Sequence, residues 1–338
     1  MRFSKRTQAA AAMLAGAAAV LAVSRLRRSR GMHGQTAFIT GGSRGLGLAL
    51  ALECARRGAD VAICARERET LDAAAERIRA CGVRTLAVSC DIRNAAEVRA
   101  ALARTYAEFG RLDVLVNNAG TIQVGPMESM TRADYEDSLR THFWAMYDAV
   151  EAAIPLMERG GGGRIVNITS IGGKVSVPHL LPYCVGKFAA VGYSEGLRAA
   201  LARKKIAVTT VVPGLMRTGS PRNAWFKGQH RKEYAWFSLS GALPMVSVSA
   251  ASAARTIVSG SLRGDPEVIV SLQAKALVRM EGISPSLTLR ALEVAEMLLP
   301  GPGGIEIQQV RGCESESGVT ESPLTALGKK AERDFNQQ

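Results

Sequence analysis

Short runs of apolar and β-branched residues alternate with segments of helical periodicity from Gly34 onward. Runs such as Val114–Val116 and Ile206–Val212 have no polar face, which is typical of parallel strands covered by helices on both sides. The alternation predicts an α/β fold with a doubly wound parallel sheet of seven strands flanked by helices. Strands are expected at about 35–40, 60–65, 84–89, 112–116, 163–169, 206–212 and 266–271, and helices at about 45–57, 67–81, 94–109, 131–158, 181–204 and 248–261.

Both ends of the chain lack this alternation. The uncharged segment Thr7–Ser24 lies near the lower limit of about 17 residues for a membrane span. Four arginines follow it at once, which opposes a signal peptide, and it has no polar stripe, so a membrane anchor is favoured, with a helix lying on the membrane as the alternative. After about residue 272, a helical stretch is followed by a polar tail. We therefore expect an anchor segment at 1–32, the main domain at 33–272 and a C-terminal extension at 273–338.

The formal net charge of +13 is concentrated in two places. Residues 1–32 carry +7, residues 217–232 carry +5, and the rest of the chain is nearly neutral at +1. A neutral body disfavours nucleic acid as a partner, because phosphate binding needs a basic face on the folded domain. The six cysteines form no C-x-x-C pair and have no accompanying histidine spacing, so we expect reduced, mostly buried thiols and no metal site.

A glycine-rich turn follows the first predicted strand and precedes the first predicted helix. Glycines at such a turn let backbone N–H groups approach a pyrophosphate, which the helix N-terminus also attracts. A glycine-rich turn alone is a weak signal, but its position after the first strand favours a dinucleotide site. The turn consists of Thr40, Gly41, Gly42, Ser43, Arg44, Gly45, Leu46 and Gly47.

The end of the second predicted strand bears on the choice of nicotinamide cofactor. An acidic residue there accepts the ribose 2′-hydroxyl of NAD, whereas a basic residue pairs with the 2′-phosphate of NADP. This chain has Arg66 at the tip, with Glu67 one position later, and Arg44 inside the glycine turn. Two arginines at the two expected places predict NADP(H), because Arg–phosphate pairing is strong.

A serine, a tyrosine and a lysine form a candidate catalytic set. Ser170 follows the fifth predicted strand, and Tyr183 and Lys187 share one face of the next helix. A nearby ammonium and a cationic nicotinamide are expected to lower the pKa of the phenol from its usual value near 10. Ser170 then holds the substrate oxygen while Tyr183 moves the proton.

Together these motifs resemble the short-chain dehydrogenase/reductase family in its form with a single Rossmann domain, over about residues 33–272. The resemblance implies that Asp91 touches the adenine, that Asn118, Ala119 and Gly120 support the adenosine ribose and the sheet, and that Lys187 also binds the nicotinamide ribose. It further implies that Thr218 contacts the nicotinamide amide or the phosphates. The residues that carry the resemblance are the glycine turn, Asp91, Asn117-Asn118-Ala119-Gly120, Ser170, Tyr183, Lys187, Pro213, Gly214 and Thr218.

One position departs from the family. The family has an Asn on the long helix before the fifth strand, where it kinks the helix so that a backbone carbonyl holds a water in the proton relay to the lysine. This chain has His142 there. Either His142 replaces the Asn by hydrogen-bonding across the helix and leaves the relay working, or it marks a slower or altered enzyme. We favour the first interpretation, because the kink needs only a polar partner.

The second basic region lies where the family has its variable substrate lid, at about 215–247. Its charges are interleaved with aromatic residues, which suits an amphipathic lid on an anionic interface or around a lipid-like substrate. The alternative, which the sequence favours equally, is that the aromatic side chains pack in a small core of their own while the charged side chains face water. The aromatic residues are Trp225, Phe226, Tyr234, Trp236 and Phe237.

The sequence as a whole predicts an NADPH-dependent reductase of a ketone or aldehyde, reversible and acting on a hydrophobic acyl-chain or steroid-like compound. The alternative is a membrane-attached NADP-binding sensor or scaffold with little turnover. The arginines at 25–30 predict a catalytic domain on the cytoplasmic side of a membrane. A homodimer or homotetramer is also expected, because family members often pair through the helices that flank the fifth strand.

Overall fold

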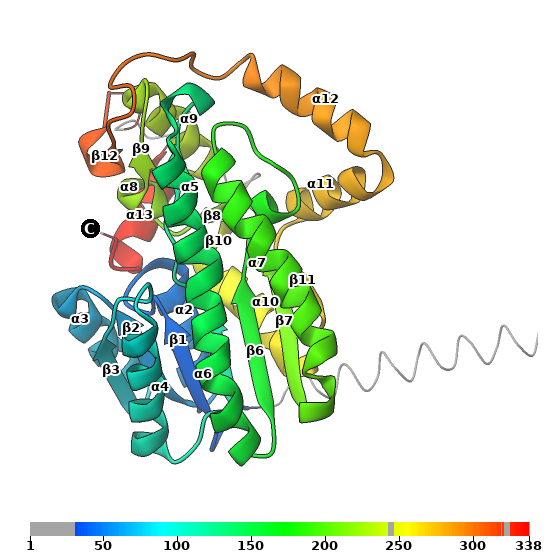
Figure 1. Cartoon of the computed structure of the whole chain (residues 1–338). Coiled ribbons are helices and arrows are strands. Elements are labelled where there is room, and N and C mark those ends of the chain that lie inside the picture. Colours follow the sequence, from blue (N-terminus) through cyan, green and yellow to red (C-terminus); the bar gives the residue numbers. More distant parts are fainter. Residues whose placement is uncertain (1–30, 243–246, 319, 321–324, 338) are drawn as a thin grey trace, which may run out of the picture.

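A computed structural model describes residues 31–242, 247–318, 320 and 325–337. Its central sheet has seven strands in the order β11-β7-β6-β4-β1-β2-β3, and every neighbouring pair is parallel (Figure 1). The doubly wound parallel sheet predicted from the sequence is confirmed. The seven strands are β1 (Thr36–Thr40), β2 (Asp60–Ala65), β3 (Thr85–Ser89), β4 (Val114–Asn117), β6 (Gly163–Ile168), β7 (Ile206–Val212) and β11 (Glu267–Ile269).

Helices cover both faces of the sheet, and each face has its own core. One core packs α2, α3 and α10 on the sheet and contains Leu48, Ile63 and Ile257. The other packs α4, α6 and α7 and contains Phe38 and Leu115. The neighbouring residues Phe38 and Ile39 therefore point into opposite cores, as a strand buried on both faces requires. The helices are α2 (Gly45–Arg56), α3 (Arg68–Arg79), α4 (Ala95–Phe109), α6 (Ala145–Arg159), α7 (Leu181–Ala200) and α10 (Ala250–Arg263).

The long helix expected at 131–158 is interrupted. It consists of α5 (Arg132–Leu139), a π-helical turn η3 (Arg140–Trp144) and then α6. The N–H of Ala145 donates to the carbonyl of Arg140, which widens the helix by one residue at this point. His142 lies inside the turn, so the break falls at the candidate site.

The region expected as a lid at about 215–247 contains short elements and one helix. Phe226, Tyr234 and Phe237 are buried together in a small core with Val124 and Leu180. Phe226, Tyr234, Phe237 and the partly buried Trp236 thus follow the second of the two interpretations, whereas Trp225 lines a cleft and the buried Lys227 departs from the expectation that the charges face water. Basic residues here are also bound within the protein: Lys227 to Asp134, Arg222 to Glu316, and Arg217 to Ser247. The elements are β8 (Met216–Arg217), α8 (Ser220–Asn223), β9 (Trp225–Phe226) and α9 (His230–Ala242).

The C-terminal extension first leaves the main domain and then returns to it. Helices α11 (Leu272–Ile283) and α12 (Pro285–Glu296) form an arm beside α7, and the chain then crosses back over the lid (Figure 1). Strand β12 (Val310–Arg311) pairs antiparallel with β9, which also pairs with β5 (Gln123–Val124). Helix α13 (Ala326–Asp334) then packs against α9 and β8.

Among the described residues, no helix is long and apolar enough to cross a membrane. The anchor expected at Thr7–Ser24 lies outside the described residues. The six cysteines are unpaired, and four of them, Cys54, Cys64, Cys90 and Cys184, are buried.

Candidate active site

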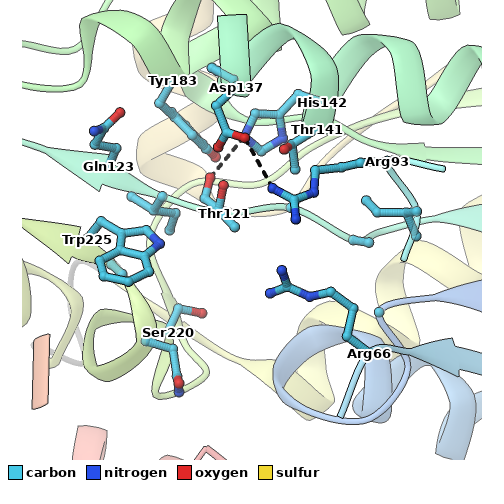
Figure 2. A pocket seen from close by; sticks show the side chains of 18 of the residues that line it. Arg66, Arg93, Thr121, Gln123, Asp137, Thr141, His142, Tyr183, Ser220 and Trp225 are labelled. Atoms are coloured by element: carbon cyan, nitrogen blue, oxygen red, sulfur yellow. Dashed lines mark hydrogen bonds and ion pairs between the residues drawn. The ribbon is translucent and has the colours of Figure 1, made fainter. Parts of the chain in front are cut away.

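The residues expected to carry the chemistry follow the carboxyl ends of the central strands. Parallel strands bring these ends to one edge of the sheet, where doubly wound folds bind their ligands. A cleft of about 500 Å³ runs along this edge. Figure 2 shows Arg66 and Arg93 on one side of the cleft, Trp225 on the opposite side, and Tyr183 and His142 at one end.

The glycine turn is fixed by hydrogen bonds to the loop after β4. The Thr40 hydroxyl accepts from the backbone N–H groups of Asn118 at 3.0 Å and Ala119 at 3.1 Å. The Asn118 amide donates back to the carbonyls of Thr40 at 3.0 Å and Gly41 at 3.2 Å. Gly41 has φ +65°, and a Cβ there would lie 2.9 Å from the Ala119 Cα, so only glycine fits. A Cβ on Gly47 would lie 2.0 Å from the Gly41 carbonyl oxygen. This close-packed turn at the start of α2 is the kind of cradle that a dinucleotide needs.

Arginines gather at the β2 end of the cleft. Arg44 is mostly buried, and its guanidinium lies 3.4 Å from the Glu67 carboxylate and 3.3 Å from the Asn223 amide oxygen. Burial lowers the pKa of Arg44, Glu67 raises it, and the positive charges of Arg311 and Arg66 lower it further. Arg44 and Arg66 both line the cleft. Asp91 lines the cleft, and Arg93 binds its carboxylate at 3.0 Å. This end of the cleft therefore combines Arg44, Arg66 and Arg93 with the carboxylates of Glu67 and Asp91.

The serine, tyrosine and lysine lie together at the other end. Ser170 hydrogen-bonds to the Tyr183 phenol, and its hydroxyl also accepts from the N–H of Gly172 at 3.1 Å. The Lys187 ammonium group donates to the carbonyl of Ile168 at 3.0 Å and lies 5.7 Å from the centre of the Tyr183 ring. Burial lowers the pKa of Lys187 to about 7.

The expected lowering of the Tyr183 pKa is not produced by the protein's own groups. Burial raises the pKa of Tyr183 to about 12, and the hydrogen bond from Ser170 offsets only part of that rise. Lys187 does not reverse the effect, because it is itself buried and only partly charged near neutral pH. Without a cofactor in the cleft, the protein's own groups therefore favour the protonated phenol.

His142 bonds outside its own helix. Its Nε2 lies 2.9 Å from the carbonyl oxygen of Thr121, in the loop after β4, so Nε2 carries the hydrogen and donates it. The expectation of a hydrogen bond across the helix is therefore wrong, although the helix is distorted at this residue by the π-helical turn. Complete burial and the charge of Lys187 hold the pKa of His142 well below its usual value, so the ring is neutral. Its buried Nδ1 has no hydrogen-bond partner among the described residues.

A small internal cavity separates His142 from Lys187. Thr40, Asn117 and Ile168 also line it, and it has room for about one water molecule. The ring of His142 stands edge-on to Tyr183, with the ring centres 5.2 Å apart. His142 and Lys187 thus border the same small cavity, and His142 also contacts Tyr183.

The main domain matches known proteins in sequence and in fold. A family model described as "short chain dehydrogenase" matches residues 35–227, which is more than half of the chain. The chain belongs to the short-chain dehydrogenase family. This family comprises oxidoreductases that act on CH–OH and C=O groups.

Three relatives of this dehydrogenase illustrate the range of similarity. "Putative oxidoreductase SadH" of Mycobacterium tuberculosis is 33% identical over 259 residues, which cover 75% of this chain and 92% of that protein. The 3-oxoacyl-[acyl-carrier-protein] reductase FabG of Staphylococcus aureus is 33% identical over 183 residues, which cover 54% of this chain and 74% of that protein. A crystal structure of a short-chain dehydrogenase from Mycobacterium paratuberculosis bound to NAD has 25% identity and a TM-score of 0.65, covering 72% of this chain and 99% of that chain.

The family resemblance also singled out residues that lie away from the cleft in this dehydrogenase. Pro213 accepts the N–H of Ile171 at 2.8 Å and thereby fixes the loop after Ser170. Thr218 is buried and bonds to the hydroxyl of Ser220, and it is Ser220 that lines the cleft. Gly214 packs against Ser271, where a Cβ would lie 2.7 Å from the hydroxyl oxygen.

Several residues of the cleft in this dehydrogenase were missed from the sequence. Arg93 comes two positions after Asp91 in the same loop, so its nearness to Asp91 in the sequence was a signal that could have identified it. Gln309 and Arg311 come from the C-terminal extension. The Arg311 guanidinium stacks 4.1 Å from the centre of the Trp225 ring and donates to the carbonyl of Asn223 at 3.2 Å. No local pattern marks these two residues, because the chain reaches the cleft only after the arm formed by α11 and α12.

Proposed function

We propose that the protein is an NADPH-dependent reductase of a hydrophobic ketone or aldehyde, able to run in reverse as an alcohol dehydrogenase. One observation carries the proposal. Tyr183, bonded to Ser170 and close to Lys187, lies at one end of the same cleft whose other end contains the glycine turn, Arg44 and Arg66. A single continuous cleft connects the two ends, and a dinucleotide is an extended ligand that suits such a cleft.

In the proposed reaction, NADPH supplies the hydride. The Ser170 hydroxyl donates a hydrogen bond to the substrate oxygen and orients it. Tyr183, which holds its proton at neutral pH, transfers that proton to the same oxygen as negative charge develops there. Lys187, with a pKa of about 7, exchanges protons readily at neutral pH and restores the proton of the phenol. His142 Nδ1, which is buried and without a hydrogen-bond partner among the described residues, is free to accept a hydrogen bond from one water in the adjoining cavity.

Two arginines support the preference for NADPH over NADH. Arg44 and Arg66 both line the cleft beside Glu67. The contact between Arg44 and Glu67 is long, at 3.4 Å, so a 2′-phosphate competes with Glu67 for the guanidinium. Asp91 lies at the same end and takes the adenine side of the cofactor in this proposal.

The walls of the cleft support an apolar substrate. Ile122 and Ala224, which pack in the same small core as Tyr183, and Trp225 contribute apolar surface to its lining. We further propose association with a membrane through residues 7–24, with the catalytic domain on the cytoplasmic side. Deleting residues 1–30 then releases the protein from membranes, and a shortened protein that still pellets with them contradicts this part.

Exposed aromatic side chains support an oligomer. Trp144, Tyr147 and Phe188 are 52%, 37% and 44% exposed on the η3, α6 and α7 surface. We propose a homodimer or homotetramer that pairs through these helices. Sedimentation of Phe188→Asp beside the unchanged protein tests this, and an unchanged mass contradicts it.

The reductase activity is tested by NADPH oxidation with a panel of ketones and aldehydes. Tyr183→Phe is expected to lower kcat by about 10² to 10⁴ fold, the range for loss of a general acid. Tyr193→Phe is the matched control, because it makes the same change ten positions along α7, at a phenol outside the cleft. Equal activity of Tyr183→Phe and Tyr193→Phe refutes the assignment of Tyr183.

Cofactor preference is tested with Arg44→Ala and Arg66→Ala. Each is expected to raise the KM for NADPH about 10-fold, corresponding to one charge-assisted hydrogen bond, and to leave the KM for NADH nearly unchanged. Arg68→Ala is the control, because Arg68 is exposed and pairs with Asp72 on its own helix. An unchanged NADPH to NADH ratio in both test variants overturns the preference.

A further inference from the structure

The last residues of the chain lie on the glycine turn. The carbonyl of Phe335 accepts the backbone N–H of Gly45 at 2.8 Å, and the Asn336 amide donates to the carbonyl of Ser43 at 3.3 Å. Figure 1 shows α13 entering this region between the lid and the carboxyl edge of the sheet. We call Phe335–Gln337 the C-terminal segment.

The C-terminal segment contacts two neighbouring loops, the glycine turn at Gly45 and the loop at Gly219. On one side, a Cβ on Gly45 would lie 2.5 Å from the Gln337 side-chain nitrogen. On the other side, a Cβ on Gly219 would lie 3.0 Å from the Gln337 Cβ and 2.6 Å from Glu332. Gln337 is buried and lines the cleft itself. The segment therefore occupies space beside the turn rather than an outer surface.

The contact with Gly45 uses a group that a phosphate also needs. Helix α2 begins at Gly45, and its N-cap Arg44 makes no side-chain hydrogen bond to the first turn. Its first turn contains no acidic residue either, so its N–H groups and the positive end of its dipole are open to an acceptor from elsewhere. The carbonyl of Phe335 is such an acceptor. A pyrophosphate bound at the N-terminus of α2 would accept from the same Gly45 N–H group and so occupy the position of the Phe335 carbonyl.

We propose that the C-terminal segment is an autoinhibitory element that competes with the pyrophosphate of NADPH for the N-terminus of α2. The proposal rests on the proposed function, because it assumes that the glycine turn binds a dinucleotide. Binding of NADPH displaces Phe335–Gln337, while α13 stays packed on α9 and β8 and keeps the segment close to the site. Dinucleotide binding is thereby coupled to the position of the C-terminus.

Arg77 on α3 holds the C-terminal segment from outside the cleft. Its guanidinium donates to the carbonyl of Asp334 at 2.8 Å and to the Asn336 side chain at 3.0 Å. Both bonds are exposed to water. Arg77 does not line the cleft, so its removal loosens the segment without changing the turn. Arg79, two positions later, bonds to Glu76 on its own helix.

The test measures the Kd for NADPH of the full chain by fluorescence, beside a chain that ends at Asp334. Removing 335–338 is expected to lower the Kd about 3- to 10-fold, since a competing state with one or two modest hydrogen bonds reduces the apparent affinity by that factor. Arg77→Ala is expected to lower the Kd in the same direction by a smaller factor. Arg79→Ala is the control and is expected to leave the Kd unchanged.

A second measurement does not depend on affinity. Carboxypeptidase is expected to remove the last residues of the full chain faster when NADPH is present, because NADPH releases them. An unchanged Kd in both the shortened chain and Arg77→Ala, or slower digestion with NADPH, overturns the proposal. The proposed function stands in that case, provided that the protein binds NADPH. Failure of the full and the shortened chain to bind either dinucleotide refutes the proposed function and this proposal together.

Discussion

A buried neutral imidazole makes the stability of this protein depend on pH in a predictable way. Burial and Lys187 hold the pKa of His142 well below its usual value in the folded protein. In the unfolded chain the pKa returns to about 6.5. Below pH 6.5 the unfolded chain therefore binds a proton that the folded protein does not, and unfolding becomes more favourable as the pH falls.

The size of this effect follows from linkage. Between pH 8 and pH 5 the unfolded chain gains about 2 kcal/mol from protonation of this single histidine, since one pKa unit corresponds to about 1.4 kcal/mol. His142→Asn removes the titrating group and keeps a polar side chain at the π-helical turn. The free energy of unfolding is therefore expected to fall by about 2 kcal/mol less in His142→Asn than in the unchanged protein over this pH interval.

Urea denaturation of both proteins at pH 8 and pH 5 measures the difference. Lower stability of the variant at both pH values does not affect the comparison, because only the change with pH is compared. The other histidines and the carboxylates are the same in both proteins, so their contributions cancel. An equal fall in the two proteins, or a larger fall in His142→Asn, refutes the burial of a neutral His142.

Two further predictions concern the same region. Lys187→Met is expected to abolish turnover yet to stabilise the fold at pH 7 by about 1 to 3 kcal/mol, because a buried amine whose pKa is lowered to about 7 opposes folding by more than the hydrogen bond to Ile168 contributes; a lower urea midpoint contradicts this. Gly120→Ala is expected to destabilise by about 1 to 3 kcal/mol, because its Cβ would lie 2.7 Å from the His142 ring. Gly192→Ala on α7, with open space around it, is expected to stabilise by about 0.5 to 1 kcal/mol, and thermal unfolding that ranks the two variants the other way contradicts the packing argument.

The central sheet was predictable because its strands are buried on both faces. Such strands are uncharged runs rich in apolar and β-branched residues, and Val61–Cys64 and Ile206–Val212 stand out for this reason. Once the sheet is parallel, the residues that follow its strands must meet at one edge. The placement of Arg66, Asp91 and Ser170 near one cleft therefore required no knowledge of side-chain packing.

The break in the long helix was not predictable from periodicity. The segments on either side of η3 have the polar or amphipathic composition of ordinary surface helices. The one extra residue of a π-helical turn does not change this pattern in a way that the sequence alone reveals. The break depends on contacts of His142 with Thr121 and with the small residues Gly120 and Gly186, which come from other elements. Only the family resemblance pointed to this residue.

The lid and the C-terminal extension must be understood together. Phe226 is fully buried in the small core, its strand pairs with β12, and a Cβ on Gly312 would lie 2.8 Å from the Tyr234 ring. The sequence left two interpretations of the lid aromatics open, since Val124 and Leu180, which pack on them, come from distant elements and the strand that pairs with β9 comes about 80 positions later. Contacts over such separations have no signature in a local pattern.

Because the lid contacts the C-terminal extension, two truncations of the extension are expected to have different effects. A chain that ends at Asp334 loses only the C-terminal segment and keeps β12 on β9, so the lid core stays covered. A chain that ends at Leu299 loses β12 and α13 as well, which leaves β9 without its β12 neighbour and removes Arg311 from the Trp225 ring. The first truncation is expected to strengthen NADPH binding, whereas the second is expected to lower the melting temperature and weaken binding, because the pairing of β12 with β9 and the packing of α13 on α9 and β8 are lost. If both truncations raise the affinity for NADPH equally, the extension only blocks the cleft, and the proposal that Gln309 and Arg311 contribute to NADPH binding is refuted.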